Sequence, residues 1–141
     1  MNRILVCLDA SPRVPHVLER ATAIAKATGG KLILFRAVGL PHDAHVPPEA
    51  LSMSPNELVE LWRRSAERDL EALRETLPPG IVESVVVKIG SPWYAICAAA
   101  KELSVDLITI GSHGYQGVDH VLGTTAAKVV NHADRSVLVV R

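Results

Sequence analysis

The residues most suited to chemistry form a glycine-containing stretch, Gly111-Ser112-His113-Gly114, followed after a spacer by Gly123-Thr124-Thr125. An apolar run at 107–110 precedes the stretch, and a helical pattern at 125–132 follows it. A strand that ends in a glycine loop and continues as a helix presents bare backbone N–H groups to a phosphate. The threonine hydroxyls lie at the helix N-terminus, where the helix dipole also favours an anion. Spacing alone leaves two interpretations open, a phosphate-binding loop and a tight connection that uses glycine for steric reasons.

The composition indicates one soluble globular domain with an aliphatic core. Hydrophobic residues make up 48% of the 141 residues and aromatic residues only 4%. The chain has 15 basic and 15 acidic residues, whereas a nucleic-acid binder usually carries a basic excess. No apolar run approaches the roughly 20 residues that span a bilayer, and Met1-Asn2-Arg3-Ile4 leads straight into a strand-like run. We therefore expect no nucleic-acid partner, no membrane contact, no signal peptide and a cytoplasmic location.

Cysteine and histidine residues give no sign of a disulfide framework or a metal site. Cys7 and Cys97 are too few for a framework, and we expect two reduced, mostly buried thiols. His42, Asp43 and His45 lie in a proline-containing segment without further ligands at a defined distance. We expect these three side chains to be solvated and the protein to hold no metal of its own.

Strand-like and helix-like segments alternate along the chain. Strand-like runs cover residues 4–8, 32–38, 82–88, 107–110 and 137–140, with four helix-like segments between them. Ser11 and Pro12 suit the start of the first helix, although Pro15 leaves that start open by a few residues. Ser54-Pro55-Asn56-Glu57 fits a capping box at the start of the second helix. Strict alternation predicts βαβ units and a mostly parallel sheet, and so an α/β fold.

Two segments raise questions of their own. The run Val137-Leu138-Val139-Val140 is as apolar as a central strand, yet it is the last strand of the chain. At a sheet edge, an apolar strand tends to pair with another chain unless it is covered. We therefore expect a homodimer that pairs through this strand. The segment 39–53 contains three prolines and little periodicity, and both a lid over a ligand and an irregular excursion remain open.

Three stretches together resemble the universal stress protein family: residues 3–11 (RILVCLDAS), 87–92 (VKIGSP) and 106–141. The resemblance covers the chain end to end, which implies one universal stress protein domain over residues 1–141. It implies a single Rossmann-like, doubly wound α/β domain, with a five-stranded sheet in the order 3-2-1-4-5 flanked by four helices. Strands one and four then lie side by side, and a crevice opens above their carboxyl ends.

The resemblance also implies a ligand for that crevice: ATP, with or without Mg²⁺, or a related adenine nucleotide. Asp9 would face the adenine and ribose, and the glycines and threonines of the loop region would hold the phosphates. One feature departs from the family's nucleotide-binding pattern, because the spacer between Gly114 and Gly123 has eight residues, one fewer than the pattern. The nucleotide contacts implied by the resemblance are Cys7, Leu8, Asp9, Ala37, Val38, Gly111, Ser112, His113, Gly114, Gly123, Thr124 and Thr125.

Three classes of function remain open at this stage. The first is a stress-response regulatory protein that binds an adenine nucleotide, has no catalytic residues, hydrolyses ATP at most very slowly and acts on an unidentified protein partner. The second is a dimeric scaffold of the same fold whose shortened loop no longer binds nucleotide. The third is a nucleotidyl-transfer enzyme, but neither a His-Ile-Gly-His loop nor a Ser-Gly-Gly loop ending in Asp-Ser is present. We therefore expect a binding protein and not an enzyme.

Overall fold

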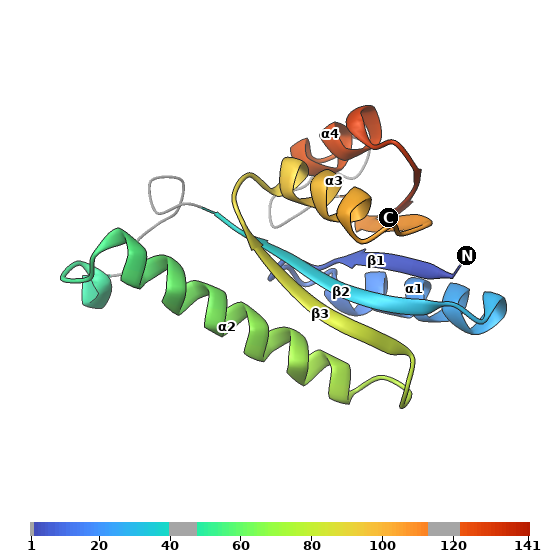
Figure 1. Ribbon diagram of the computed structural model, residues 1–141, viewed down its shortest axis with the longest axis horizontal. Helices are drawn as coiled ribbons and strands as arrows, with labels where there is room; N and C mark the ends of the chain where they lie inside the picture. Colours follow the sequence, from blue (N-terminus) through green and yellow to red (C-terminus); the bar gives the residue numbers. More distant parts are fainter. Residues whose placement is uncertain (1, 40–47, 113–121) are drawn as a thin grey trace.

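The computed structural model describes residues 2–39, 48–112 and 122–141 and contains a five-stranded parallel sheet (Figure 1). The strand order is β3-β2-β1-β4-β5, and each neighbouring pair runs parallel. This confirms the predicted α/β class and the order 3-2-1-4-5. The strands are β1 (Arg3–Cys7), β2 (Lys31–Val38), β3 (Val82–Ile89), β4 (Leu107–Gly111) and β5 (Ser136–Val140).

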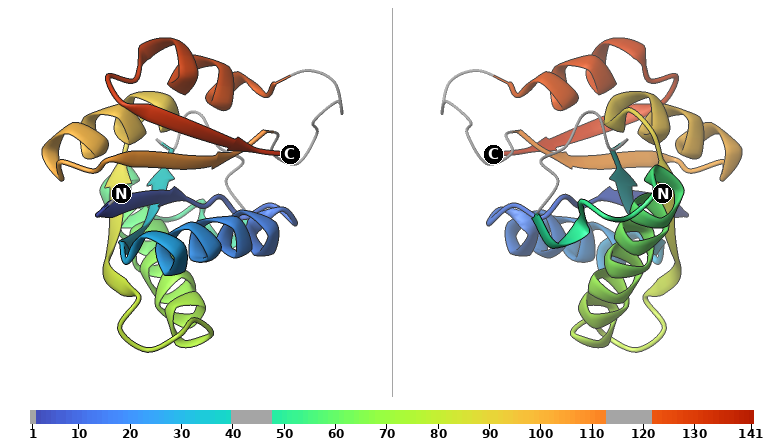
Figure 2. Two further views of the ribbon diagram at one scale, coloured as in Figure 1. Left: turned by 90° about the vertical axis from the view of Figure 1, so that its right-hand side faces the viewer. Right: turned by 90° about the vertical axis from the view of Figure 1, so that its left-hand side faces the viewer.

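Helices cover both faces of the sheet, as Figure 2 shows. On one face lie α1 (Val14–Thr28) and α2 (Pro55–Glu75), and on the other lie α3 (Pro92–Glu102) and α4 (Thr124–His132). A short 3-10 helix, η2 (Pro48–Ala50), precedes α2. The four predicted helical segments are thereby confirmed, and the site-forming strands β1 and β4 lie at the centre of a three-layer structure.

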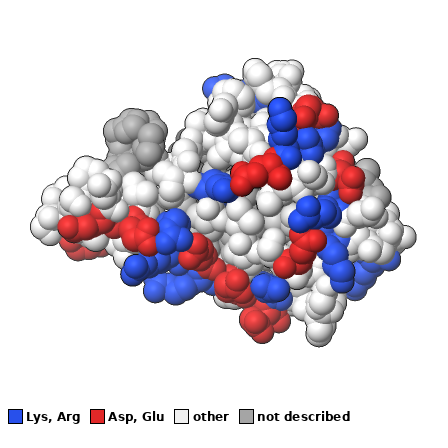
Figure 3. All heavy atoms as spheres, viewed as in Figure 1, with Lys and Arg blue, Asp and Glu red and all other residues white. Residues whose placement is uncertain are grey.

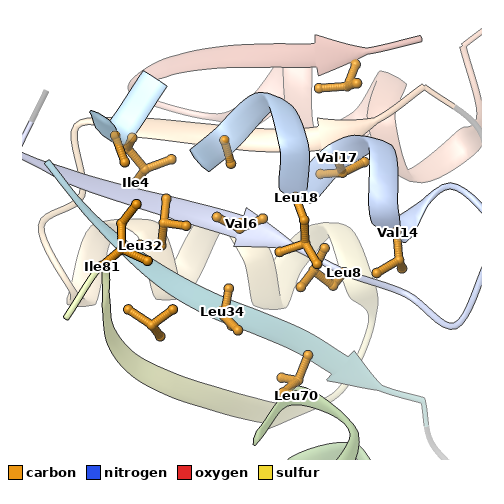
Figure 4. Packing of buried hydrophobic residues seen from close by; sticks show 14 of the residues in the cluster. Ile4, Val6, Leu8, Val14, Val17, Leu18, Leu32, Leu34, Leu70 and Ile81 are labelled. Carbon is orange, nitrogen blue, oxygen red and sulfur yellow. The ribbon is translucent and has the colours of Figure 1, made fainter. Parts of the chain in front are cut away.

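Alternation along the strands builds two separate cores. In β1, Ile4 and Val6 pack toward α1 and α2, whereas Leu5 and Cys7 pack toward α3 and α4. Figure 4 shows the first core, in which Leu70 of α2 lies beside side chains of β2. Successive strand residues point to opposite faces, and both faces are covered. That is why β1 is apolar at every position after Arg3 instead of alternating.

The helix starts agree with the sequence signals in one case and differ in the other. The Ser54 hydroxyl accepts a hydrogen bond from the N–H of Glu57 at 3.2 Å, as the predicted capping box requires. The prediction that Ser11 caps the first helix was wrong, because Arg13 is the N-cap of α1 and makes no side-chain cap bond. Ser11 instead accepts from the N–H of Arg13 at 3.3 Å in the preceding turn. Pro15 explains the later start, since proline is best tolerated in a first helical turn.

The surface that carries α2 has mixed charge. Lys and Arg lie among Asp and Glu on the face shown in Figure 3, and on α2 Glu60 pairs with Arg64 at 3.1 Å while Arg63 pairs with Glu67 at 2.5 Å. Pairs spaced three or four residues apart are typical of a solvated helix face. Among the described helices, none combines the length and the apolar character that a membrane crossing requires.

Candidate functional site

A pocket of about 330 Å³ opens at the carboxyl ends of β1 and β4. The chain leaves β1 toward β2 on one side and leaves β4 toward β5 on the other, so the connections diverge at this point of the sheet. Divergence of this kind opens a crevice at the carboxyl edge of a parallel sheet. N-terminal residues of α1 and α4, which cover opposite faces of the sheet (Figure 2), line its two sides. The volume falls within the ~300–1,000 Å³ range that small-molecule sites usually have.

The pocket joins an apolar interior to a set of polar groups. Its apolar lining includes Phe35 of β2, Ile96 of α3 and Ile110 of β4. An apolar slot of this kind suits a flat aromatic ring, and the polar groups around it suit hydroxyl and anionic substituents. The polar and charged lining residues are Asp9, Ser11, Arg13, Arg36, Ser112, Thr124 and Thr125.

Asp9 lies two residues beyond the end of β1 and is held by a local turn. Its Oδ1 accepts the N–H of Ser11 at 2.9 Å, an arrangement that fixes the carboxylate at the pocket. The side chain is exposed, and a carboxylate offers further lone pairs on both oxygens. Asp9 can therefore accept hydrogen bonds from the hydroxyl groups of a bound sugar.

Arg36 braces the end of β1 from the neighbouring strand. Its Nε donates to the carbonyl of Leu8 at 3.1 Å, and one Nη donates to the carbonyl of Asp9 at 3.1 Å. The other Nη pairs with Oδ2 of Asp69 on α2, also at 3.1 Å. The guanidinium thus donates hydrogen bonds to two carbonyls that would otherwise lack partners where β1 leaves the sheet. These bonds keep the Asp9 backbone in place.

The start of α4 supplies backbone donors to the other side of the pocket. The N–H of Gly123 bonds to the Ser112 carbonyl at 2.7 Å, and the N–H of Ser112 bonds to the Val140 carbonyl at 2.8 Å. Within α4 the N–H of Ala127 donates to Gly123 at 2.9 Å, and Gly123 caps the helix without a side-chain bond. The N–H groups in the first turn of a helix have no partner inside the helix, and the dipole makes that end favourable for anions. This end of the pocket can therefore bind a phosphate.

Cys7 contributes a neutral wall to the pocket. Burial raises the pKa of its thiol far above the usual value, and the nearby Cys97 raises it further. Burial also raises the pKa of Cys97, with a smaller contribution from the Asp134 carboxylate. Both cysteines are free, with Cys7 buried and Cys97 half-buried. A thiol that stays protonated acts as a small apolar group and not as a nucleophile.

Most of the predicted site residues that the structure describes meet at this pocket. Val38 is the exception, because it is buried at the end of β2 and is not among the lining residues. His113 and Gly114 lie outside the described residues, as do His42, Asp43 and His45. Across the described ranges, no group of three His, Cys, Asp or Glu side chains is arranged to hold a metal ion. The predicted residues that line the pocket are Cys7, Leu8, Asp9, Ala37, Gly111, Ser112, Gly123, Thr124 and Thr125.

Several lining residues were missed by reasoning from the sequence. Arg36 carried a usable signal, since it is the one charged residue within the apolar run 32–38. Arg13 was missed because the first helix was expected to begin nearer Ser11. Five other missed residues come from helices that the strand pattern does not place at the pocket: Val14 and Val17 of α1, Pro92 and Ile96 of α3, and Ala126 of α4. The remaining three are Ser11 in the turn before α1, Phe35 of β2 and Ile110 of β4.

The chain is similar along its whole length to a known protein family and to solved structures. The model of the Universal stress protein family matches residues 1–141. Universal stress protein A homolog 2 of Coxiella burnetii is 43% identical over 143 residues, which cover 99% of this chain and 94% of that protein. The solved structure of universal stress protein UspA from Lactobacillus plantarum is 26% identical, covers 99% of this chain and 97% of its own, and has a TM-score of 0.75.

Two further solved structures carry adenine nucleotides. One is a universal stress protein in complex with cAMP, 23% identical with a TM-score of 0.66, covering 99% of this chain and 96% of its own. The other is the universal stress protein from Archaeoglobus fulgidus in complex with dAMP, 19% identical with a TM-score of 0.65, covering 100% and 98%. At these identities the likeness is one of fold.

Proposed function

The chain belongs to the universal stress protein family, and from that premise we propose that its pocket binds an adenine nucleotide, ATP first among them. The protein is a regulatory binding domain over residues 1–141, in which nucleotide occupancy is the signal. The observation that carries this proposal is the pairing of an apolar slot with an uncapped helix N-terminus in one pocket.

The division of the pocket matches the parts of a nucleotide. The base would lie against the apolar lining between β1 and β2, where Phe35 and Ala37 contribute. Asp9 would accept hydrogen bonds from the ribose hydroxyls. The phosphates would lie at the first turn of α4, beside Thr124 and Thr125, where free N–H groups and the helix dipole favour negative charge. Relatives of the same fold that carry cAMP and dAMP support the choice of an adenine nucleotide.

Regulation suits the site better than catalysis. Rapid phosphoryl transfer needs a group that positions the attacking water and a cation that stabilises the transition state. Among the described lining residues the one carboxylate, Asp9, follows β1, whereas the proposed phosphate site lies at the start of α4. We therefore expect ATP to be sensed and at most slowly hydrolysed.

The edge strand β5 supports a dimeric form of the regulator. It pairs with β4 along one side, and no strand of the described residues lies along its other side. We propose that a second copy pairs along Val137–Val140, as expected for an apolar edge. Sedimentation should then give a dimer, and the β5 amides that point away from β4 should exchange hydrogen slowly. A monomer, or fast exchange at those amides, would contradict this pairing.

Calorimetric titration of the nucleotide-stripped protein tests the proposal. ATP with Mg²⁺ should bind with micromolar affinity, about one per subunit, and AMP serves as the comparison. Gly123→Val should abolish this binding by placing a branched side chain at the phosphate end, and its backbone angles (φ −62°, ψ 160°) are open to any residue. A thermal melt of the variant controls for folding.

The shortened spacer between Gly114 and Gly123 is the observation that favours the alternative, a dimeric scaffold without nucleotide. No heat of binding and no thermal shift up to millimolar ATP would overturn the nucleotide proposal in favour of this scaffold.

A further inference from the structure

Arg13 is a cation in the pocket lining for which the described residues supply no counterion. It is half-buried at the N-cap of α1, and its guanidinium has no carboxylate or carbonyl partner among the described residues. The first turn of α1 contains no acidic residue either. A positive side chain at the positive end of a helix dipole is unfavourable unless an anion lies nearby. Arg13 therefore stands where an anionic ligand would relieve the repulsion.

The other charged lining residues are already engaged. Arg36 pairs with Asp69 and bonds to two carbonyls, and Asp9 accepts the N–H of Ser11. Arg36 has an ion-pair partner, whereas Asp9 and Arg13 have none among the described residues. Arg13 is therefore the cation of the described lining that is available to an anionic ligand.

The position of α1 brings this charge to the same pocket as the start of α4. Helix α1 packs on β1 and β4, the two strands whose ends flank the crevice, and also contacts β2 and β5. The first turn of α4 lines the same pocket, and Figure 2 shows α1 and α4 on opposite faces of the sheet. A phosphate chain that starts at Thr124 and Thr125 would therefore extend from the N-terminus of α4 toward the N-terminus of α1, where Arg13 lies.

We propose that Arg13 contacts the outer phosphates of the bound nucleotide and makes the pocket select nucleoside triphosphates over monophosphates. This inference rests on the proposed function, since it concerns which adenine nucleotide fills the site. Arginine suits the role because its planar fork donates two hydrogen bonds to phosphate oxygens. AMP, cAMP and adenosine lack the outer phosphates and gain little from this contact.

The test compares two arginines of the same helix by calorimetry with ATP, AMP and adenosine, each with Mg²⁺ at one ionic strength. Arg13→Gln should weaken ATP binding by at least about tenfold and AMP binding by less than about threefold. Arg13→Lys should recover part of the loss because it restores the charge. Arg20→Gln is the matched control, since Arg20 is exposed on α1 and does not line the pocket, and it should leave all three affinities unchanged.

Each outcome separates this inference from the proposed function. Equal loss of ATP and AMP affinity in Arg13→Gln would mean that Arg13 only maintains the pocket, and it would overturn the inference. An unchanged ATP affinity, or a wild-type protein that binds ATP and AMP equally, would also overturn it while leaving nucleotide binding intact. A wild-type protein that binds none of the three would overturn the proposed function itself. Raising the salt concentration should weaken ATP binding more in the wild type than in Arg13→Gln.

Discussion

Arg36 on β2 pairs with Asp69 on α2 at 3.1 Å while the same guanidinium holds the carbonyls of Leu8 and Asp9. Asp69 is not among the lining residues of the pocket, yet α2 is thereby joined to the strand end that carries Asp9. Arg36 supports this end of β1 in addition to the backbone bond from the N–H of Leu8 to the Phe35 carbonyl at 2.8 Å, so we expect the shape of the pocket to depend on it.

Replacing Arg36 with methionine should cost both stability and nucleotide affinity. The Arg36 side chain is 14% exposed, so the carbonyls of Leu8 and Asp9 would lose a charged donor with little water to replace it. We expect the free energy of unfolding to fall by about 1–3 kcal/mol in urea denaturation. Asp69→Asn is the control, because Asp69 is 60% exposed and its loss should cost less than about 1 kcal/mol. Equal costs for both variants would contradict the bracing role of Arg36.

Thr124→Glu should change stability and binding in opposite directions. Thr124 is the first residue of α4, is exposed, and begins a turn without an acidic residue. A carboxylate there complements the helix dipole, and we expect a gain of about 0.3–1 kcal/mol in thermal or urea denaturation. The same charge would repel a phosphate at that helix end, so ATP affinity should fall by at least about tenfold. The uncharged variant Thr124→Gln should show a smaller gain in stability and a smaller loss of ATP affinity. An acidic variant that binds ATP normally would place the phosphates elsewhere.

Thiol labelling should report occupancy of the pocket. The Cys97→Ala variant leaves Cys7 in the pocket wall, whereas the Cys7→Ala variant leaves Cys97, which does not line the pocket. Cys7 should react slowly with a thiol reagent at pH 8, because it is buried and burial raises its pKa. Saturating ATP should slow labelling of Cys7 severalfold more than labelling of Cys97. If ATP leaves the labelling rate of Cys7 unchanged, the ligand does not cover this wall.

The stability contributed by Asp106 should disappear in acid. Its Oδ2 accepts the N–H groups of Asn2 and Arg3 at 2.8 and 2.9 Å and ties the start of β1 to the start of β4. The bonds from Arg3 and then Asn2 lower the pKa of this carboxyl below its usual value in the folded state. The folded state therefore binds its proton less readily than the unfolded chain, and the stabilisation is present above about pH 4. It is lost as the pH falls through the folded pKa. The melting temperatures of the wild type and Asp106→Asn should differ at pH 7 and converge as the pH falls below the usual range of an aspartate carboxyl, whereas a constant gap would contradict this linkage.

Much of the fold could be predicted because its signals are local. The continuous apolar character of β1 and β4 reflects cover on both faces, and Asp9 and Gly111 lie at the same edge because parallel strands end together. The strand order itself came from the family resemblance and not from the alternation. Local signals therefore supply the strands, the helices and the glycine loop, whereas the family resemblance supplied the place of the pocket and about half of its lining.

The rest of the site depends on long-range packing that no local pattern reveals. Arg36 is a site residue because Asp69, far along the chain, meets it on one face of the sheet. Arg13 lines the pocket because α1 begins later than Ser11 suggests, and Val38 does not line it, although it is next to Ala37 in β2. A position at a strand end is therefore insufficient to assign a contact.

An amide-resolved NMR titration with ATP and Mg²⁺ tests the central claim most directly, because it reports binding and its location together. The account predicts saturable shifts, with one dissociation constant, for the amides of Gly111, Ser112, Gly123, Thr124 and Thr125. The amides of Leu18, Leu73 and Leu77, in the groove between α1 and α2, should stay unchanged. No saturable shift at the first group up to millimolar ATP, or shifts confined to the second, would contradict the claim that the pocket at the ends of β1 and β4 binds the nucleotide.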